Sequence, residues 1–263
     1  MRIDERKVLK LENIISEILP LTADTSQFNR VFIPIEHDFS LELANENNLN
    51  IYHLRTENRR FKYEDLTNFC VGNLSQYIFN RKTVKQAKSQ ADIQILYNRG
   101  RKQLREVRNE NDSGAGGELG ELLLYLFLEN CLHAPKLLSK MEIKTTRNQY
   151  IYGADGLHLY MTKDKYGNML YQFVIGEAKI KNDILDATRV AFDSIRKSID
   201  EIDIETALVS EEILKEVCTK EDAEKLIEVI LPSEDIADKF TTSEKAIGLF
   251  IGYTGDYDED IDN

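Results

Sequence analysis

The sequence has only three cysteines, and their spacing is not that of a disulfide scaffold. Cys70, Cys131 and Cys218 are odd in number and far apart, which argues against a disulfide scaffold and a zinc cluster and is typical of the reducing cytoplasm. There is no apolar stretch of about 18 residues and no signal-peptide pattern. We therefore expect a cytoplasmic protein that does not enter a membrane.

Positive charge is also scarce over most of the chain. The 263 residues include 34 Lys and Arg against 46 Asp and Glu, a formal net charge of −12. So acidic a protein repels nucleic acid as a whole, and any binding of nucleic acid must depend on a local basic surface. At this length the chain can form one domain with a full core, or a core with an accessory lobe.

One basic segment lies between residues 81 and 108. It holds nine Lys and Arg against two acidic residues, a local net charge of +7, with Tyr97 among them. This density suits phosphate contacts that are independent of base sequence and sensitive to salt. The alternative interpretation is a solvated helix face. The expected nucleic-acid-binding residues are Lys85, Lys88, Arg99, Arg101, Lys102 and Arg105.

Two predicted strands carry the most informative residues. Residues 171–180 are aromatic and β-branched, 155–161 form a second strand, and the segment between them has the Gly and Asn of a tight turn. Glu177 and Lys179, two apart in a strand, share a face. A hairpin centred on the turn sets Asp155 opposite Glu177, with Cβ atoms roughly 4.5–5.5 Å apart. A shift of one residue would turn Asp155 to the other face.

A helix is predicted upstream, over residues 117–130. Its leucines form a broad apolar face, and the remaining stripe consists of Glu118, Glu121, Tyr125 and Glu129. Carboxylates on the polar strip of a nearly buried helix need a metal, basic groups or water as partners. Either Glu118 or Glu121 could reach a site over the sheet, and the spacing does not choose between them.

Together these residue types suggest a metal centre. Mg²⁺, with Mn²⁺ as a possible substitute, prefers oxygen ligands, which Asp155, Glu177 and the carbonyl of Ala178 would supply, with one helix Glu as a further candidate. Lys179 can orient an attacking water and offset charge in the transition state. Simpler interpretations exist: an exposed pair for Glu177 and Lys179, a turn residue for Asp155, and a helix-dipole partner for Glu118.

The stretches GELGELLLYLFLE, GADGLHLY and IGEAK resemble the PD-(D/E)xK nuclease superfamily and, more closely, the HamA family of the Hachiman anti-phage defence system. The resemblance runs from roughly residue 30 to the end and is strongest in 110–200. It implies a core of helix, three strands, helix and strand, and a DNA-degrading effector that works with a partner helicase, HamB. The family's metal and catalytic positions fall on Asp155, Glu177 and Lys179, with the helical Glu on Glu118 or Glu121. Ala154 departs from the superfamily motif, which has Pro there.

The expected fold class is therefore α/β (α+β), with a restriction-endonuclease-like core. We expect a small N-terminal α+β lobe over 1–108 that docks a partner or DNA, and the PD-(D/E)xK core over 109–263. The lobe would hold short strands within 30–55 and a helix at 62–79. The core would add helices at 183–199 and 221–230 and a final strand at 246–253, with residues 201–245 forming an acidic, helical insertion.

The function that we expect is a Mg²⁺-dependent DNA nuclease of anti-phage defence, with little sequence specificity and controlled by a helicase. Two alternatives stay open. One is a catalytically silent binding module that regulates a helicase. The other is an RNase, because similar metal chemistry cleaves either backbone. The intact set of Asp155, Glu177 and Lys179 favours the enzyme.

Overall fold

The computed structural model describes residues 15–39, 48–111, 116–139, 141, 154–163, 169–198, 219–230 and 243–253. The predicted mixed α/β class is confirmed. By their contacts, the residues group into two compact units, of which the smaller is Asp24–Asn73 and the larger is the rest of the chain. The division at residue 108 into an N-terminal docking lobe and a nuclease core stays a prediction.

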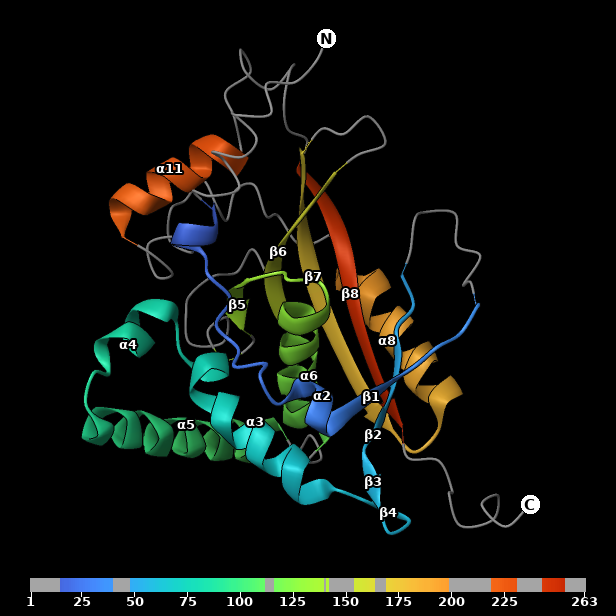
Figure 1. Ribbon diagram of the computed structural model, residues 1–263. Coiled ribbons are helices and arrows are strands. Elements are labelled where there is room, and N and C mark those ends of the chain that lie inside the picture. Colours follow the sequence, from blue (N-terminus) through green and yellow to red (C-terminus); the bar gives the residue numbers. More distant parts are fainter. Residues whose placement is uncertain are drawn as a thin grey trace. The chain divides into compact units, whose positions relative to one another are not determined.

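A four-stranded sheet lies at the centre of the larger unit (Figure 1). In spatial order its strands are β5 (Lys136–Ser139), β6 (Gly156–Lys163), β7 (Met169–Lys181) and β8 (Ser243–Tyr253). The first three are antiparallel neighbours, whereas β7 and β8 run parallel. Gly156 pairs with Gly176, so Asp155 and Glu177, the next residues outward, come opposite each other. The predicted hairpin register is therefore confirmed.

Helix α6 (Gly116–Cys131) covers one face of this sheet. A Cβ added at Gly120 would lie 3.4 Å from the Cβ of Ala178, and Leu124 packs in one apolar cluster with Val174 and Ala178. The even-numbered residues of β7 therefore point toward α6. Because side chains alternate along a strand, Glu177 and Lys179 point to the other face.

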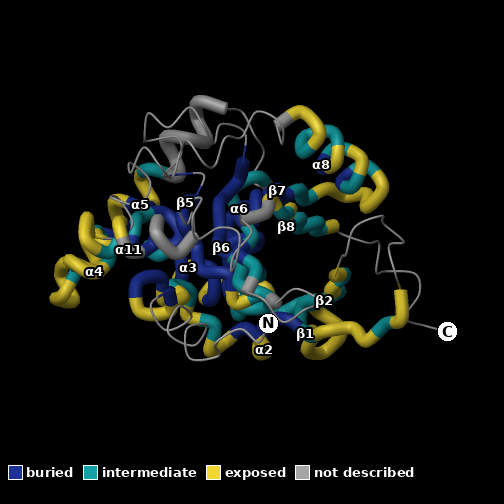
Figure 2. Tube along the Cα trace, turned by 90° about the horizontal axis from the view of Figure 1, so that it is seen from above, coloured by how far each residue is buried: buried dark blue, intermediate teal, exposed yellow. Residues whose placement is uncertain are grey.

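Helix α8 (Ile184–Ser198) packs against β7 and β8. In Figure 2, these two strands run between α6 and α8. A parallel pair needs a crossover connection, which here includes α8 and then α11 (Lys220–Ile230). Ala187 and Ala191 on α8 are completely buried. Both predicted helices and the predicted last strand are confirmed within a few residues at each end.

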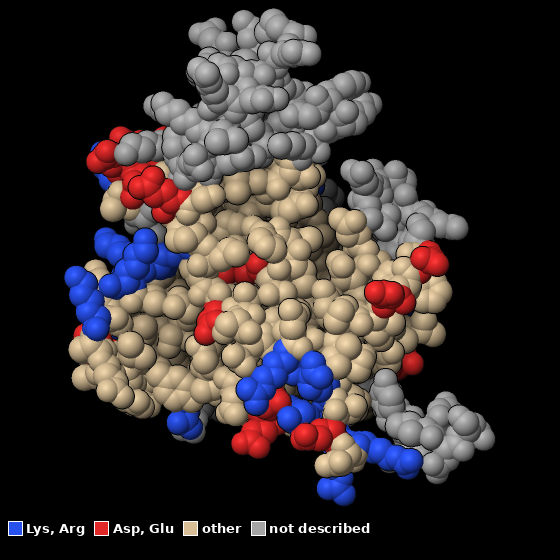
Figure 3. Space-filling model, viewed as in Figure 1, with Lys and Arg blue, Asp and Glu red and all other residues tan. Residues whose placement is uncertain are grey.

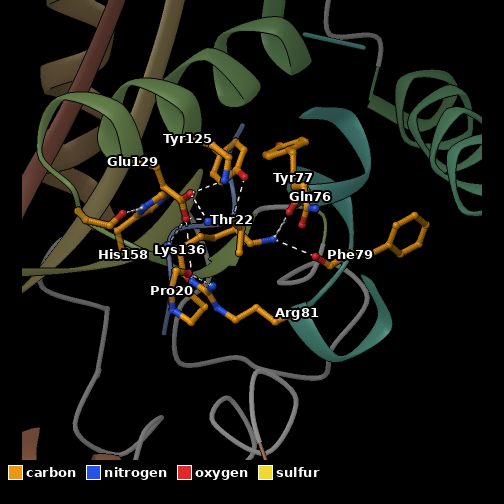
Figure 4. A network of polar contacts seen from close by, with 12 residues as sticks. Pro20, Thr22, Gln76, Tyr77, Phe79, Arg81, Tyr125, Glu129, Lys136 and His158 are labelled. Carbon is orange, nitrogen blue, oxygen red and sulfur yellow. Dashed lines mark hydrogen bonds and ion pairs between the residues drawn. The ribbon is translucent and has the colours of Figure 1, made fainter. Parts of the chain in front are cut away.

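A buried polar network joins α6 to the chain before it (Figure 4). Glu129 is completely buried, and its carboxylate accepts hydrogen bonds from the backbone N–H groups of Thr22 and Ala23, both at 2.6 Å, and of Lys136 at 2.8 Å. The Thr22 hydroxyl donates a further hydrogen bond of 3.0 Å to the Glu129 carboxylate. A buried carboxylate with this many donors is satisfied by the protein itself, so Glu129 is structural.

The side chain of Lys136 extends the network to the end of helix α3. Its Nζ donates to the carbonyls of Gln76, Tyr77 and Phe79 at 2.7, 3.1 and 3.0 Å. These carbonyls lie at the C-terminal end of α3 (Tyr63–Ile78), where a helix has acceptors without internal partners. Arg81 is also buried, and it donates to the Lys136 carbonyl at 2.7 Å. Arg81, the first residue of the basic segment 81–108, is therefore not part of an exposed basic surface.

The smaller unit is built around an aromatic cluster. The rings of Phe28, Phe32 and Phe69 contact one another, with centroids 5.0 to 6.3 Å apart. Its elements are α2 (Phe28–Val31), β1 (Phe32–Ile35), β2 (Ile51–Leu54), β3 (Thr56–Glu57), β4 (Arg60–Phe61) and most of α3. The short strands predicted within 30–55 and the helix predicted at 62–79 are confirmed.

Two helices follow α3 in the larger unit: α4 (Arg81–Gln86) and α5 (Gln90–Asn111). Leu96 and Gly100, one turn apart on α5, are buried, and a Cβ at Gly100 would meet the Ile78 side chain at 3.1 Å. One line of α5 thus packs on the end of α3. None of the described helices is both long and apolar enough to cross a bilayer.

Candidate active site

The carboxylates of Asp155 and Glu177 lie next to each other just beyond Gly156 and Gly176, the last paired residues of β6 and β7. The Asp155 N–H donates to the Gly176 carbonyl at 2.9 Å, and the Ala178 N–H donates to Asp155 Oδ2 at 2.7 Å. Asp155 is 4% exposed and Glu177 is 3% exposed. The backbone of β7 therefore fixes the Asp155 carboxylate beside Glu177, inside the protein.

Burial raises the pKa of the Glu177 carboxyl above its ordinary value, and the neighbouring charge of Asp155 raises it further. Hydrogen bonds from Lys179 and Ser194 act in the opposite direction, because they stabilise the charged form. The net direction is upward. Holding both carboxylates ionised at this place therefore costs free energy unless positive charge is close by.

Lys179 supplies part of that charge. Its Nζ forms an ion pair with Glu177 Oε1 and lies 3.2 Å from the Ala178 carbonyl oxygen. The side chain is 25% exposed, so its ammonium group has access to solvent. The structure thus brings together the acidic, carbonyl and basic groups predicted for the site: Asp155, Glu177, Ala178 and Lys179.

The two candidate carboxylates of α6 do not complete a larger acidic group. Glu121 is buried and accepts a hydrogen bond of 2.9 Å from the Tyr77 hydroxyl, while Glu118 lies partly buried in the first turn of the helix. In the described part of the chain, no three His, Cys, Asp or Glu side chains gather closely enough to hold a metal ion. Participation of Glu118 or Glu121 in the site stays a prediction.

The candidate nucleic-acid-binding residues lie on α4, on α5 and between them. Figure 3 shows Lys and Arg side chains gathered over α4. Two of the guanidinium groups rest near aromatic rings, Arg99 at 5.4 Å from the Phe79 centroid and Arg101 at 5.8 Å from that of Tyr97. The side chain of Arg105 lies outside the described residues. The exposed members of the set are Lys85, Lys88, Arg99, Arg101 and Lys102.

Sequence reasoning missed one residue at the site, Ser194 on α8. On this helix Ala187 and Ala191 are both completely buried. Ser194 stands three residues after Ala191 and hydrogen-bonds the Glu177 side chain. A hydroxyl at helical spacing from buried alanines is the signal that would have pointed to it.

His158, in contrast, has no place in the site. It is buried on β6, and its Nδ1 lies 2.8 Å from the Ala134 carbonyl oxygen. Burial lowers the pKa of His158 to about 4, so the ring is neutral at physiological pH. By strand alternation His158 also points to the face opposite Asp155, so its role is structural.

The comparisons with known proteins show the family of the chain. The family model for HamA matches residues 28–263, a span that includes the whole four-stranded sheet and every candidate site residue. No match was found among curated proteins or among solved structures. The chain therefore belongs to the HamA family and is a component of a Hachiman anti-phage defence system.

Proposed function

We propose that this chain is a metal-dependent nuclease that cleaves DNA with little sequence specificity. The observation that carries the proposal is the convergence of Asp155, Glu177 and Lys179 at the parting of β6 and β7. Two buried carboxylates with an adjacent, partly exposed ammonium group are the parts needed for metal-assisted hydrolysis of a phosphodiester.

The order of elements supports the same proposal. From α6 onward the described chain runs through a helix, three strands, helix α8 and, after α11, a last strand parallel to the third. This succession is the one that the resemblance to the PD-(D/E)xK superfamily implies. Asp155 directly precedes the second of these strands, and Glu177 and Lys179 stand on the third. Residues that lie between α8 and β8, including α11, form the insertion.

The donor set fits a hard divalent cation. Mg²⁺ is commonly bound through one or two carboxylates, with waters and substrate phosphate taking the other positions, so Asp155, Glu177 and the Ala178 carbonyl suffice. The raised pKa of Glu177 fits as well, because positive charge between the two carboxylates would offset their repulsion. Such an ion supplies Lewis-acid polarisation of the scissile phosphate and activation of water. Mn²⁺ is the alternative ion.

Lys179 has a separate task in this mechanism. Its protonated Nζ pairs with Glu177 but is partly open to solvent, so a change of side-chain rotamer would let it donate to a water or a phosphate oxygen. A fixed cation near the attacked phosphorus stabilises the negative charge that develops in the transition state. Lys179 would therefore orient the attacking water and stabilise charge, while Asp155 and Glu177 would hold the metal.

Substrate binding would depend on the exposed Lys and Arg of residues 85–102. Contacts between these side chains and phosphates read no base sequence and weaken steeply with salt. The resemblance to HamA also implies a partner helicase of the HamB type. Control by that helicase would restrain a nuclease that otherwise attacks any DNA.

The test is degradation of plasmid and linear DNA with Mg²⁺, by this chain alone and with the helicase encoded beside it plus ATP. Lys179→Ala is compared with Lys220→Ala, a matched control on α11 whose lysine is 71% exposed. We expect cleavage by wild type and the control, and loss of at least about 100-fold in Lys179→Ala. Cleavage retained in Lys179→Ala would refute the site. A folded wild type that cleaves no DNA would favour the silent binding module, or an RNase if it cleaves RNA.

A further inference from the structure

Helix α8 brings a hydroxyl to the face of β7 that carries the candidate site. Its buried stripe contains Ala187 and Ala191, each 0% exposed, and continues at Ser194. Residues three and four apart on a helix lie on the same side, so Ser194 faces the sheet as the two alanines do. The small side chains let the backbone of α8 approach β7 closely.

The side chain that Ser194 meets there is Glu177. The Ser194 hydroxyl donates a hydrogen bond to the Glu177 carboxylate. The Lys179 ammonium group donates another. Ser194 is partly buried and comes from a different element than Lys179. Glu177 is thus held from its own strand by an ammonium group and from α8 by a hydroxyl.

Lys179 and Ser194, the two donors to Glu177, differ in how freely their side chains can move. Lys179 is partly exposed and, in the proposed mechanism, must turn toward water and phosphate. The Ser194 side chain is short, and it stands on a helix whose residues Ala187 and Ala191 are buried against the sheet. When Lys179 leaves the carboxylate, the Ser194 hydroxyl is the donor that still restrains Glu177.

We propose that Ser194 is a positioning residue, whose hydroxyl holds the Glu177 carboxylate in the orientation needed to bind a divalent cation. This inference rests on the proposed nuclease function. Groups that hydrogen-bond a ligating carboxylate keep it in place for the metal, and their loss typically weakens metal affinity about 10- to 100-fold. Ser194 itself touches neither metal nor substrate.

The experiment is a titration of the folded, full-length chain with Mn²⁺, followed by electron paramagnetic resonance. The variants are Ser194→Ala, Ser194→Thr and Thr188→Ala, a control on the same helix whose hydroxyl bonds the Ile184 carbonyl at 2.7 Å. We expect Mn²⁺ affinity to fall about 10- to 100-fold in Ser194→Ala, to recover in Ser194→Thr and to stay unchanged in the control. Thermal unfolding is measured alongside, to verify that each variant is folded.

A second readout separates positioning from general structure. In cleavage assays, the Mn²⁺ concentration for half-maximal rate should rise in Ser194→Ala by a similar factor, while the rate at saturating Mn²⁺ changes less. Equal affinity in Ser194→Ala and wild type overturns the inference, as does a loss that Ser194→Thr fails to recover. The variant Glu177→Ala distinguishes a failure of the proposed metal site from a failure of the role proposed for Ser194. If it binds Mn²⁺ like wild type, the proposed metal site is wrong; if it alone loses Mn²⁺, only the role of Ser194 is wrong.

Discussion

Asp155 Oδ2 accepts a hydrogen bond of 2.7 Å from the backbone N–H of Ala178, the residue between Glu177 and Lys179. One oxygen of the Asp155 carboxylate is thus hydrogen-bonded to the backbone of β7, the strand that carries Glu177 and Lys179. This bond ties the start of β6 to β7 beyond the last regular pair, Gly156 with Gly176. Asp155 therefore has a structural role beside the chemical role proposed for it, and substitutions can separate the two.

Asp155→Asn and Asp155→Ala should differ in stability although both lose cleavage. The Asn side chain keeps an oxygen that can accept from the Ala178 N–H, whereas Ala leaves that buried donor without a partner, at a cost of about 1–3 kcal/mol. Neither side chain is an anionic ligand. Urea unfolding gives the two free energies, and DNA cleavage gives the activity. Equal stabilities would mean that the bond contributes little, and full activity in Asp155→Asn would exclude Asp155 as a ligand.

The hairpin was predictable because strand alternation and the turn both constrain it. A hairpin centred on the segment predicted as its turn brings Asp155 opposite Glu177, and the observed pairing of β6 with β7 has this register. Helices α6 and α8 were likewise predictable from their apolar periodicity. These features follow from local patterns.

What the sequence could not predict depends on long-range partners. Lys136 opens the buried strand β5, and a lysine in a sequence ordinarily indicates surface. In the folded protein, three carbonyls at the end of α3, some sixty positions earlier, accept hydrogen bonds from its Nζ. The burial of Arg81 could not be predicted for the same reason. No local pattern shows such a partner.

Removing the carboxylate of Glu129 should destabilise the fold strongly. Glu129→Ala leaves the N–H groups of Thr22, Ala23 and Lys136 without their acceptor. It also removes the anion that lies 4.0 Å from the buried guanidinium group of Arg81. Breaking one partner of a buried charged network typically costs about 3–5 kcal/mol.

The measurement is the free energy of unfolding in urea. Glu64→Ala is the control, because Glu64 is an exposed carboxylate on α3 and its loss should change stability by less than about 0.5 kcal/mol. A Glu129→Ala protein as stable as Glu64→Ala would show that the network is not needed for the fold.

Acid should destabilise the protein through His158. In the folded state burial lowers the pKa of this ring to about 4 from 6.5; the charge of Glu129 opposes the shift, while Lys136 and Arg81 add to it. The unfolded chain therefore binds the proton more readily, so the contribution of the neutral ring is complete above pH 6.5 and is lost as pH falls toward 4. The size of this loss is about 2–4 kcal/mol.

The check is the unfolding free energy of wild type and His158→Gln between pH 7.5 and 4.5, measured as a difference at each pH. A neutral amide cannot titrate, so the stability of the variant should fall less steeply than that of wild type over this range, whatever its absolute stability. Parallel curves would show that His158 takes up no proton on unfolding.

Neutralising two lysines should change how DNA binding responds to salt. Lys85 on α4 and Lys88 just after it are exposed, and each phosphate contact adds about −0.9 to the slope of log K against log salt concentration on duplex DNA. The double variant Lys85→Ala, Lys88→Ala should therefore have a slope less steep by about 2. The control variant replaces Lys220 and Lys245, which are also exposed and lie on α11 and β8. Both variants lose the same net charge, so a general electrostatic effect would alter their slopes equally. Binding is measured in EDTA, where cleavage does not interfere, and a change confined to the first variant would identify residues 85–88 as part of the surface that contacts phosphate.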